Sequence, residues 1–472
     1  MAELHDLTAL EQGRAIAAGE VSALELTDHY LARSEALGDD VGAFVRLLPE
    51  LARDQARAAD DAVRAGGVPA QSPLFGVVCP VKDLDVIAGV PTSFGNPDLN
   101  VVFDVDSNVV TALRAGGLVF TGKTNTPEFG LPCYTEPDGR RPARTPWDLN
   151  RSASGSSGGA AGAVAAGLAP VAQGSDGGGS VRLPSAVCGL VGIKPSRGRV
   201  STGPYDYSVG DLTVMGPLAR NVRDAAALLD VMSAFHAVGE PYRAMPVHGT
   251  FLAAADRPAP TLRIGYYTQP VIGVTEPSAP VVTAVQDTVA LLVELGHEVV
   301  EIAPPLGHDA VPLFETLWAG LADSQDFPPA VMASFTPLTR YLRGRAAGRT
   351  AGDLAAAVAA IRRKARDSMI ASEDFDVVLS PTAADVPFRV GSMRDDADPA
   401  ADFEAQKQWA SYTAVYNVTG QPSINLPLNW TPDGLPVGVQ FAGRRDDEAL
   451  LITLSAQLEE ARPWHARRPG LW

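Results

Sequence analysis

The sequence predicts an α/β protein with a mixed central β-sheet and helices on both of its faces. Segments with the pattern of strands alternate with segments of helical pattern along the chain. Residues 262–302 form a strand-helix-strand unit, and two later strand segments surround the turn at Pro432-Asp433-Gly434. Alternation of this kind is typical of a sheet that is covered by helices on both sides.

Helical spacing of apolar residues marks the N-terminal region 6–66. Residues 7–37 repeat apolar side chains at helical intervals, and residues 48–65 continue as a helix with a polar face. Further helices of the first half are expected at 108–115, 160–166 and 222–235, and strands at 75–81, 118–121 and 169–173.

A linker with several prolines is expected at 236–260, before the second half of the chain. The second half is expected to contain strands at 262–267, 298–302, 375–379, 423–428 and 437–442, and helices at 279–295, 310–323, 354–371, 403–418 and 448–460. Because strands return after the region around 263–381, that region is interpreted as a cap or lobe within a single domain spanning 1–472.

Composition limits the classes of function. The 472 residues are 46% hydrophobic and 20% charged, as in soluble globular proteins. A net charge of −17 argues against a surface for nucleic acid or anionic membrane, since both need a basic patch. The three cysteines lie far apart, which favours a reducing compartment. We see neither a signal peptide nor ~18 uninterrupted apolar residues, so a cytoplasmic protein is expected.

Two clusters of glycine and serine, at 154–159 and 174–184, flank an alanine-rich run at 160–172. Glycine at this density usually marks tight turns or a backbone that closely approaches a ligand. A flexible linker is the plainer interpretation. Aliphatic segments separate the clusters, and Asp176 and Arg182 interrupt the second, which argues against a linker.

Two short motifs suggest other chemistries. Residues 117–124 fit the phosphate-loop pattern that ends in Gly-Lys-Thr, but the loop positions themselves have the pattern of a strand. Residues 155–159 fit the Gly-x-Ser-x-Gly elbow around Ser157, for which His465 with Asp374 or Asp376 would have to complete a triad. The seven histidines show no metal-ligand spacing, so no metal site is predicted.

A hydrolase without a nearby histidine needs another base, and Lys82 is the candidate. It ends the most apolar strand segment of the first half, where burial would lower the pKa of its ammonium group. The alternative is a surface turn in which Lys82 pairs with Asp83 or Asp85. Spacing alone leaves both interpretations open.

The chain resembles the amidase signature family of hydrolases over most of its length. The resemblance runs through residues 155–185, including Asp176, Gly178, Ser180, Val181, Arg182 and Pro184. Further matching segments are 76–83, 122–129, 192–195, 216–220, 417–422 and 436–440. The chain departs from the family pattern at Ser154, where glycine is usual, and at Gly177, where a side chain is usual.

The resemblance implies a Ser-cisSer-Lys triad. Ser180 would be the nucleophile, Ser156 the bridging serine after a cis peptide bond, and Lys82 the base. The backbone N–H groups of Gly177, Gly178, Gly179 and Ser180 would form the oxyanion hole. Asp176, Arg182 and Ser157 would support these groups.

The implied function is hydrolysis of a small-molecule carboxylic amide through an acyl-enzyme, without metal or cofactor. Aryl and alkyl amides, esters, carbamates and nylon-type oligomers are among the substrate classes considered. The alternatives are an amidotransferase subunit that releases ammonia for a partner, and an α/β-hydrolase-type esterase. A monomer or homodimer is expected. Residues 129–136, 202–207, Trp318 and Trp409 are the candidates for lining the substrate pocket.

Overall fold

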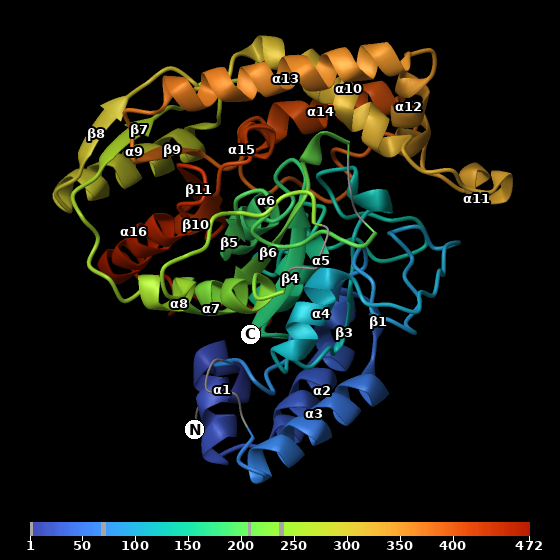
Figure 1. Ribbon diagram of the computed structural model, residues 1–472, viewed down its shortest axis with the longest axis vertical. Coiled ribbons are helices and arrows are strands. Elements are labelled where there is room, and N and C mark those ends of the chain that lie inside the picture. Colours follow the sequence, from blue (N-terminus) through green and yellow to red (C-terminus); the bar gives the residue numbers. More distant parts are fainter. Residues whose placement is uncertain (1–2, 68–71, 206–208, 236–239) are drawn as a thin grey trace.

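A mixed β-sheet forms the centre of the protein (Figure 1). The computed structural model describes residues 3–67, 72–205, 209–235 and 240–472. Within them, one eight-stranded sheet has the order β4 (Val171–Asp176), β6 (Val214–Ala219), β5 (Val191–Lys194), β10 (Ser423–Trp430), β11 (Pro436–Gly443), β9 (Val377–Pro381), β7 (Arg263–Tyr266) and β8 (Glu298–Glu301). Neighbours are antiparallel from β4 to β9, and β7 runs parallel to both β9 and β8.

Helices cover both faces of this sheet. Successive residues of a strand point to opposite sides, so apolar residues of one strand contribute to a core on each face. Leu379 and Phe441 join one core, whereas their neighbours Val378 and Ala442 join the other. The first face packs against α7 (Val222–Met232), α9 (Ala279–Glu294) and α16 (Glu448–Ala461). The second packs against α5 (Gly158–Ala165) and α6 (Arg182–Cys188). The predicted fold class is confirmed.

A second, three-stranded sheet has the order β1 (Phe44–Leu47), β3 (Gly122–Thr124) and β2 (Val81–Lys82). The predicted strands at 75–81 and 118–121 are therefore wrong in their bounds. These segments are joined by a bridge between Val78 and Val119 and by a hydrogen bond from the Gly76 N–H to the Gly117 carbonyl. Pro80 lacks the N–H that a continuous ladder needs, so pairing resumes only at Val81.

The N-terminal region contains three helices, α1 (Ala9–Ala18), α2 (Ala23–Val41) and α3 (Pro49–Arg64), which lie at one end of the molecule (Figure 1). The single periodic stretch predicted at 7–37 is broken at Gly19, whose φ of 72° ends α1 in the left-handed conformation. Ser22 then begins α2 by accepting the Glu25 N–H. The predicted helix 403–418 is likewise two helices, α14 (Pro399–Trp409) and α15 (Ala414–Thr419).

The region around 263–381 contributes β7, β8 and β9 to the central sheet and a layer of helices beyond its second face (Figure 1). This layer contains α10 (Val311–Ala322), α12 (Pro337–Ala346) and α13 (Ala351–Ala371), and the short helix α11 (Pro329–Ala333) projects beside it (Figure 1). The two short helices α11 and α12 were not predicted. The single domain over 1–472 stays a prediction.

The remaining helices are short. They are α4 (Asn108–Ala115), α8 (Phe251–Ala254) and the 3-10 turns Leu4–Asp6, Glu128–Gly130, Val209–Asp211 and His308–Ala310. Helix α8 lies inside the expected linker 236–260, of which 236–239 fall outside the described residues. Its Phe251 is buried, so this part of the chain is packed against the core. None of the described helices has both the length and the apolar character that crossing a membrane requires.

Candidate active site

The side chain of Lys82 lies at the end of β2, fully buried among serines. Its Nζ is 2.8 Å from Ser156 Oγ, 2.9 Å from Ser157 Oγ and 3.0 Å from Ser175 Oγ. Its backbone N–H donates to Gln173 Oε1 over 2.9 Å. The surface-turn interpretation of Lys82 is therefore wrong.

Burial lowers the pKa of Lys82 to about 7, although the charges of Asp85 and Asp176 act in the opposite direction. An ammonium group loses hydration in such a place, so its neutral form is favoured. Near neutral pH a large fraction of Lys82 is thus an amine that can accept a proton.

Ser156 and Ser157 come just before α5, in the loop that the first glycine cluster forms. The peptide bond between Gly155 and Ser156 is cis, as the resemblance implied. A Cβ at Gly155 would lie 2.8 Å from the backbone of Tyr134, so only glycine fits there. The Ser157 N–H donates to the Ser180 carbonyl over 3.2 Å, which holds the two glycine-rich loops side by side.

A buried ion pair fixes the loop that carries Ser180. Asp176 ends β4, and its carboxylate accepts from Arg182 Nε and Nη2 at 2.9 and 2.8 Å. It also accepts the backbone N–H groups of Gly179 (2.7 Å) and Val181 (3.2 Å). Burial opposes ionisation of Asp176, but the Arg182 guanidinium outweighs it and holds the pKa of this carboxyl below its usual range. Arg182 Nη2 also donates to Asn417 Oδ1 over 2.7 Å, and this hydrogen bond connects the loop to α15.

The backbone N–H groups around Ser180 differ in whether they donate a hydrogen bond to another part of the protein. In the described part of the chain, those of Gly177, Gly178 and Ser180 have no protein acceptor. The Gly179 N–H, which was included in the predicted oxyanion hole, instead donates to Asp176. No hydrogen bond joins the hydroxyls of Ser156 and Ser180 among the described residues, but both side chains line the same cavity.

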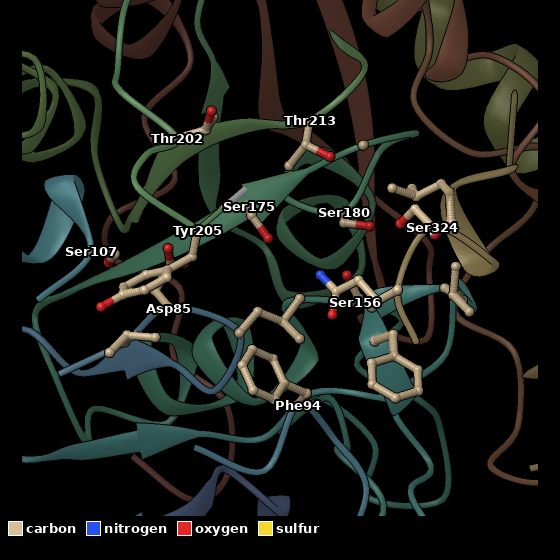
Figure 2. A pocket seen from close by; sticks show the side chains of 18 of the residues that line it. Asp85, Phe94, Ser107, Ser156, Ser175, Ser180, Thr202, Tyr205, Thr213 and Ser324 are labelled. Atoms are coloured by element: carbon tan, nitrogen blue, oxygen red, sulfur yellow. Dashed lines mark hydrogen bonds between the residues drawn. The ribbon is translucent and has the colours of Figure 1, made fainter. Parts of the chain in front are cut away.

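This cavity has a volume of about 430 Å³ (Figure 2). Its apolar wall contains Leu84, Val86, Phe94, Val101, Phe103, Phe129, Leu131, Met215, Trp318, Leu321, Ala322 and Phe327. Its polar wall contains Asp85, Ser107, Ser156, Ser175, Ser180, Thr202, Tyr205, Thr213, Ser324 and Gln325. A smaller cavity of about 70 Å³ shares Leu131, Ser180 and Trp318 with it and continues past Gly178 towards Lys407. Ser180 therefore lies where two cavities meet.

The structure places several of the predicted pocket residues on these walls. Phe129, Gly130 and Leu131 line the larger cavity, and residues 131–133 the smaller one. Thr202 and Tyr205 line the larger cavity, whereas 206 and 207 lie outside the described residues. Trp318 borders both cavities. Trp409 borders neither, because its indole is buried against Phe388 and donates to a backbone carbonyl.

Sequence reasoning missed Asp85 and Ser175 as residues of this site. Ser175 stands inside the second glycine cluster, and Asp85 follows Lys82 by three positions. Their positions close to Lys82 and to the glycine cluster in sequence were the available signal. Only the fold shows that both residues line the cavity beside Lys82 and Ser156.

The two departures from the family pattern have different structural settings. Ser154 has a φ of 61°, in the left-handed region where glycine is preferred, and its hydroxyl donates to the Cys133 carbonyl over 2.9 Å. At Gly177 a Cβ would meet Thr213 and Trp318 at an ordinary contact distance of 3.4 Å. The missing side chain at Gly177 thus leaves the larger cavity open beside Trp318.

The other motifs are not assembled into sites. Lys123 lies in β3 and pairs with Asp83 at 3.2 Å in the protein interior, so residues 117–124 do not form a phosphate loop. Ser157 is bonded to Lys82, whereas His465 is exposed and lines a different surface depression. One described group, Glu3, His5 and His29, brings potential metal ligands within 4.8 Å of one another, but it belongs to the N-terminal helices.

Comparison with known proteins defines the class of this protein. The model of the amidase family matches residues 25–452. A Mycobacterium bovis protein that bears the amidase name AmiB2 is 39% identical, covering 98% of each chain. A glutamyl-tRNA(Gln) amidotransferase subunit from Thioalkalivibrio sulfidiphilus is 34% identical, covering 99% of each chain.

Solved structures agree with this match. The structure of 6-aminohexanoate cyclic dimer hydrolase with substrate has a TM-score of 0.91, 32% identity and full coverage of both chains. A bacterial aryl acylamidase of the amidase signature family has a TM-score of 0.87 and 26% identity over 98% of both chains. The chain belongs to the amidase signature family. It is a hydrolase that acts on amide bonds.

Proposed function

We propose that this hydrolase cleaves a small-molecule carboxylic amide through an acyl-enzyme on Ser180. The observation that carries the proposal is the buried Lys82 amine, 2.8 Å from the hydroxyl of Ser156, on the wall of the cavity that Ser180 also lines. An amine of lowered pKa beside a serine is an arrangement that activates a nucleophile.

Proton transfer follows from this geometry. Neutral Lys82 takes the proton of Ser156, and Ser156 takes the proton of Ser180 as the Ser180 oxygen attacks the carbonyl carbon. The hydroxyls of Ser156 and Ser180 come into hydrogen-bonding distance in the substrate complex, as catalytic contacts commonly do. The same relay returns the proton to the amide nitrogen, so that it leaves as a neutral amine. Water then attacks the acyl-enzyme through the same relay.

The negative oxygen of the tetrahedral intermediate needs donors that are already in position. The N–H groups of Gly177, Gly178 and Ser180 have no acceptor within the described residues and lie on the loop that Asp176 and Arg182 hold. We assign the oxyanion hole to these three. The Gly179 N–H supports the loop instead. Each donor of this kind contributes ~3–4 kcal/mol to the stability of the transition state.

The two cavities on either side of Ser180 suit a substrate with a group on each side of the scissile bond. The larger one holds a group with both apolar and polar parts, and the smaller one a compact group. The net charge of −17 supports a small-molecule substrate rather than nucleic acid or a membrane surface. A cytoplasmic monomer or homodimer remains part of the proposal.

An amidotransferase subunit is the second candidate, favoured by the relative of that name with 99% coverage. Such a subunit would release ammonia from an amide for a partner. The experiment is to incubate the purified chain alone with a panel of anilides, alkyl amides, esters, carbamates and glutamine. Turnover of anilides or alkyl amides by the single chain supports the hydrolase. Activity on glutamine alone, and only with an added partner, would favour the amidotransferase.

A further inference from the structure

A buried carboxylate lines the larger cavity at a position that the proposed chemistry does not use. Asp85 is only 3% exposed, and its side chain belongs to the cavity wall. One of its oxygens, Oδ2, accepts from Gln173 Nε2 over 2.7 Å. Ser107 lines the same side of the cavity (Figure 2), and within the described residues its hydroxyl has no hydrogen-bond partner. Both of these neighbours are neutral groups.

The carboxylate of Asp85 lacks a cation of its own. Lys123 pairs with Asp83 at 3.2 Å and bonds only to the backbone carbonyl of Asp85. Lys82 donates to the serine hydroxyls. In the described ranges no ion pair includes Asp85. Burial raises the pKa of this carboxyl, although the charges of Lys123 and Lys82 act in the opposite direction. A carboxylate without an ion-pair partner is costly to bury, and a cationic group of a ligand would offset that cost.

The neighbouring cavity wall has the chemistry of an ammonium site. Phe94, Phe103 and Tyr205 line the same cavity, with ring centroids 6.2 Å apart between Phe94 and Phe103 and 4.8 Å apart between Phe103 and Tyr205. Ammonium groups are attracted to aromatic faces as well as to carboxylates. The hydroxyls of Ser107 and Thr202 on this wall add hydrogen-bond acceptors.

Position separates this wall from the reacting groups. Figure 2 shows Asp85, Ser107 and Tyr205 on one side of the cavity, with Ser156 and Ser180 towards the other and Ser324 beyond them. Leu84, Val86 and Met215 supply apolar surface to the same cavity. A substrate with an apolar chain could thus contact both Ser180 and the wall around Asp85.

We propose that the Asp85 wall binds a protonated amino group of the substrate, so that the enzyme prefers amides with an ammonium group separated from the scissile bond by an apolar chain. This inference rests on the proposed function and adds a substrate class to it. A primary or secondary amine that is protonated at neutral pH is the ligand.

The test compares anilides whose acyl chains end in an amino, a methyl or a carboxylate group, over a series of chain lengths. A second series carries the same groups on the amine side of the amide, which identifies the side of the substrate that reaches Asp85. We expect one chain length in one series at which kcat/KM for the amino compound exceeds that for its methyl counterpart by about tenfold or more. Similar values for both at every length in both series would overturn the inference.

Variants separate Asp85 from general attraction of cations to an acidic protein. Asp85→Asn should bring the amino-to-methyl ratio close to one, even though the change also alters turnover of all substrates through Lys82. Asp326→Asn is the matched control, since this exposed carboxylate stands between the cavity residues Gln325 and Phe327 and its loss changes net charge equally. The ratio should survive in Asp326→Asn. A ratio that survives in Asp85→Asn, or falls equally in both variants, would contradict the assignment.

A binding measurement keeps the inference testable without turnover. In a Ser180→Ala variant, n-alkylamines should raise the Tm more than alkanols or alkanoates of equal length, and Asp85→Asn in that background should remove the difference. Equal shifts for the three classes would overturn the ammonium site. Hydrolysis of methyl-terminated anilides with no amino preference would also overturn it while leaving the proposed function intact.

Discussion

Lys82 and Ser156 are joined by a hydrogen bond of 2.8 Å in a place where Lys82 is fully buried and Ser156 borders the larger cavity. Lys82 itself is therefore shielded from the cavity, whereas its hydrogen-bond partners Ser156 and Ser175 line it. Burial lowers the pKa of Lys82 to about 7, which is what its proposed role as a base near neutral pH requires.

Replacement of Ser180 tests the proposed nucleophile. A serine-directed phosphonate should label the protein stoichiometrically, and Ser180→Ala should abolish the label while reducing amide turnover by about 10³-fold or more. Mass spectrometry of the intact and digested protein measures the label. Labelling that persists in Ser180→Ala but is lost in Ser157→Ala would instead support the esterase hypothesis.

The pH dependence of kcat/KM tests the state of Lys82. The base must be neutral, and its pKa is lowered to about 7, so log kcat/KM should rise with pH below about 7 and level off above it. Folding stability has a related dependence. The native pKa lies below the ordinary value of 10.5, so the native state binds fewer protons between these values, and the Lys82 contribution to stability should increase with pH across that window. A pH-independent kcat/KM across neutral pH would contradict a titrating lysine.

Lys82→Ala should affect amides more than activated esters. An amide nitrogen must be protonated as it leaves, whereas the leaving group of an activated ester needs no proton. The variant should lose activity on both, with the greater loss on the amide. The measurement is kcat/KM for a matched anilide and nitrophenyl ester, after circular dichroism has confirmed folding. Equal losses on the two substrates would argue against proton return through this residue.

The ion pair between Asp176 and Arg182 should be essential to folding stability. Both side chains have no exposed surface, so Arg182→Met leaves a buried carboxylate without its partner and should cost about 3–5 kcal/mol of unfolding free energy. Arg53→Met is the matched control, because its pair with Asp28 is partly exposed and screened by solvent, so its loss should change the unfolding free energy much less. Urea unfolding measures both. Equal effects in the two variants would show that Arg182 does not hold the loop.

Activity should not depend on ATP, and excess chelator should leave it unchanged. The lysine of the phosphate-loop pattern, Lys123, is paired with Asp83 inside the protein. Saturating ATP at 100 times a dissociation constant would add ~2.7 kcal/mol of stability if it bound. No change in Tm with ATP is the expected result of differential scanning fluorimetry. A shift that disappears in Lys123→Ala would revive the nucleotide hypothesis.

The alternation of strand and helix patterns was sufficient to predict the α/β class. The long match to the family motif was sufficient to select Lys82, Ser156 and Ser180 as candidates. The sequence was insufficient for element bounds where the backbone conformation decides. Gly19 divides a continuous helical periodicity, and Pro80 interrupts an apolar run that has the composition of a strand. The spacing of apolar residues in the sequence does not reveal either break.

The contacts around the site were also beyond the sequence. Lys82 does not form an ion pair with Asp83, because Asp83 pairs instead with Lys123 of the neighbouring strand β3. Nothing in the sequence indicates this pairing. Whether the Gly179 N–H is free to bind a substrate oxygen depends on how the loop folds around the Asp176 carboxylate, to which this N–H donates. The nearness of Asp85 to Lys82 in sequence did not indicate a cavity wall, because that wall exists only where Asp85 and Ser107 lie beside Thr202 and Tyr205 in the fold (Figure 2).

The position of Ser180 between two cavities bears on the order of events after the first bond is cleaved. If Ser180 carries the acyl group as proposed, that group can remain in one cavity after the amine has left the other. The vacated cavity would then admit another nucleophile, and hydroxylamine or a small amine would compete with water for the same acyl ester. Such partitioning would make the protein an acyl transferase whenever acceptors are abundant, with product ratios governed by the fit of the acceptor to the empty cavity.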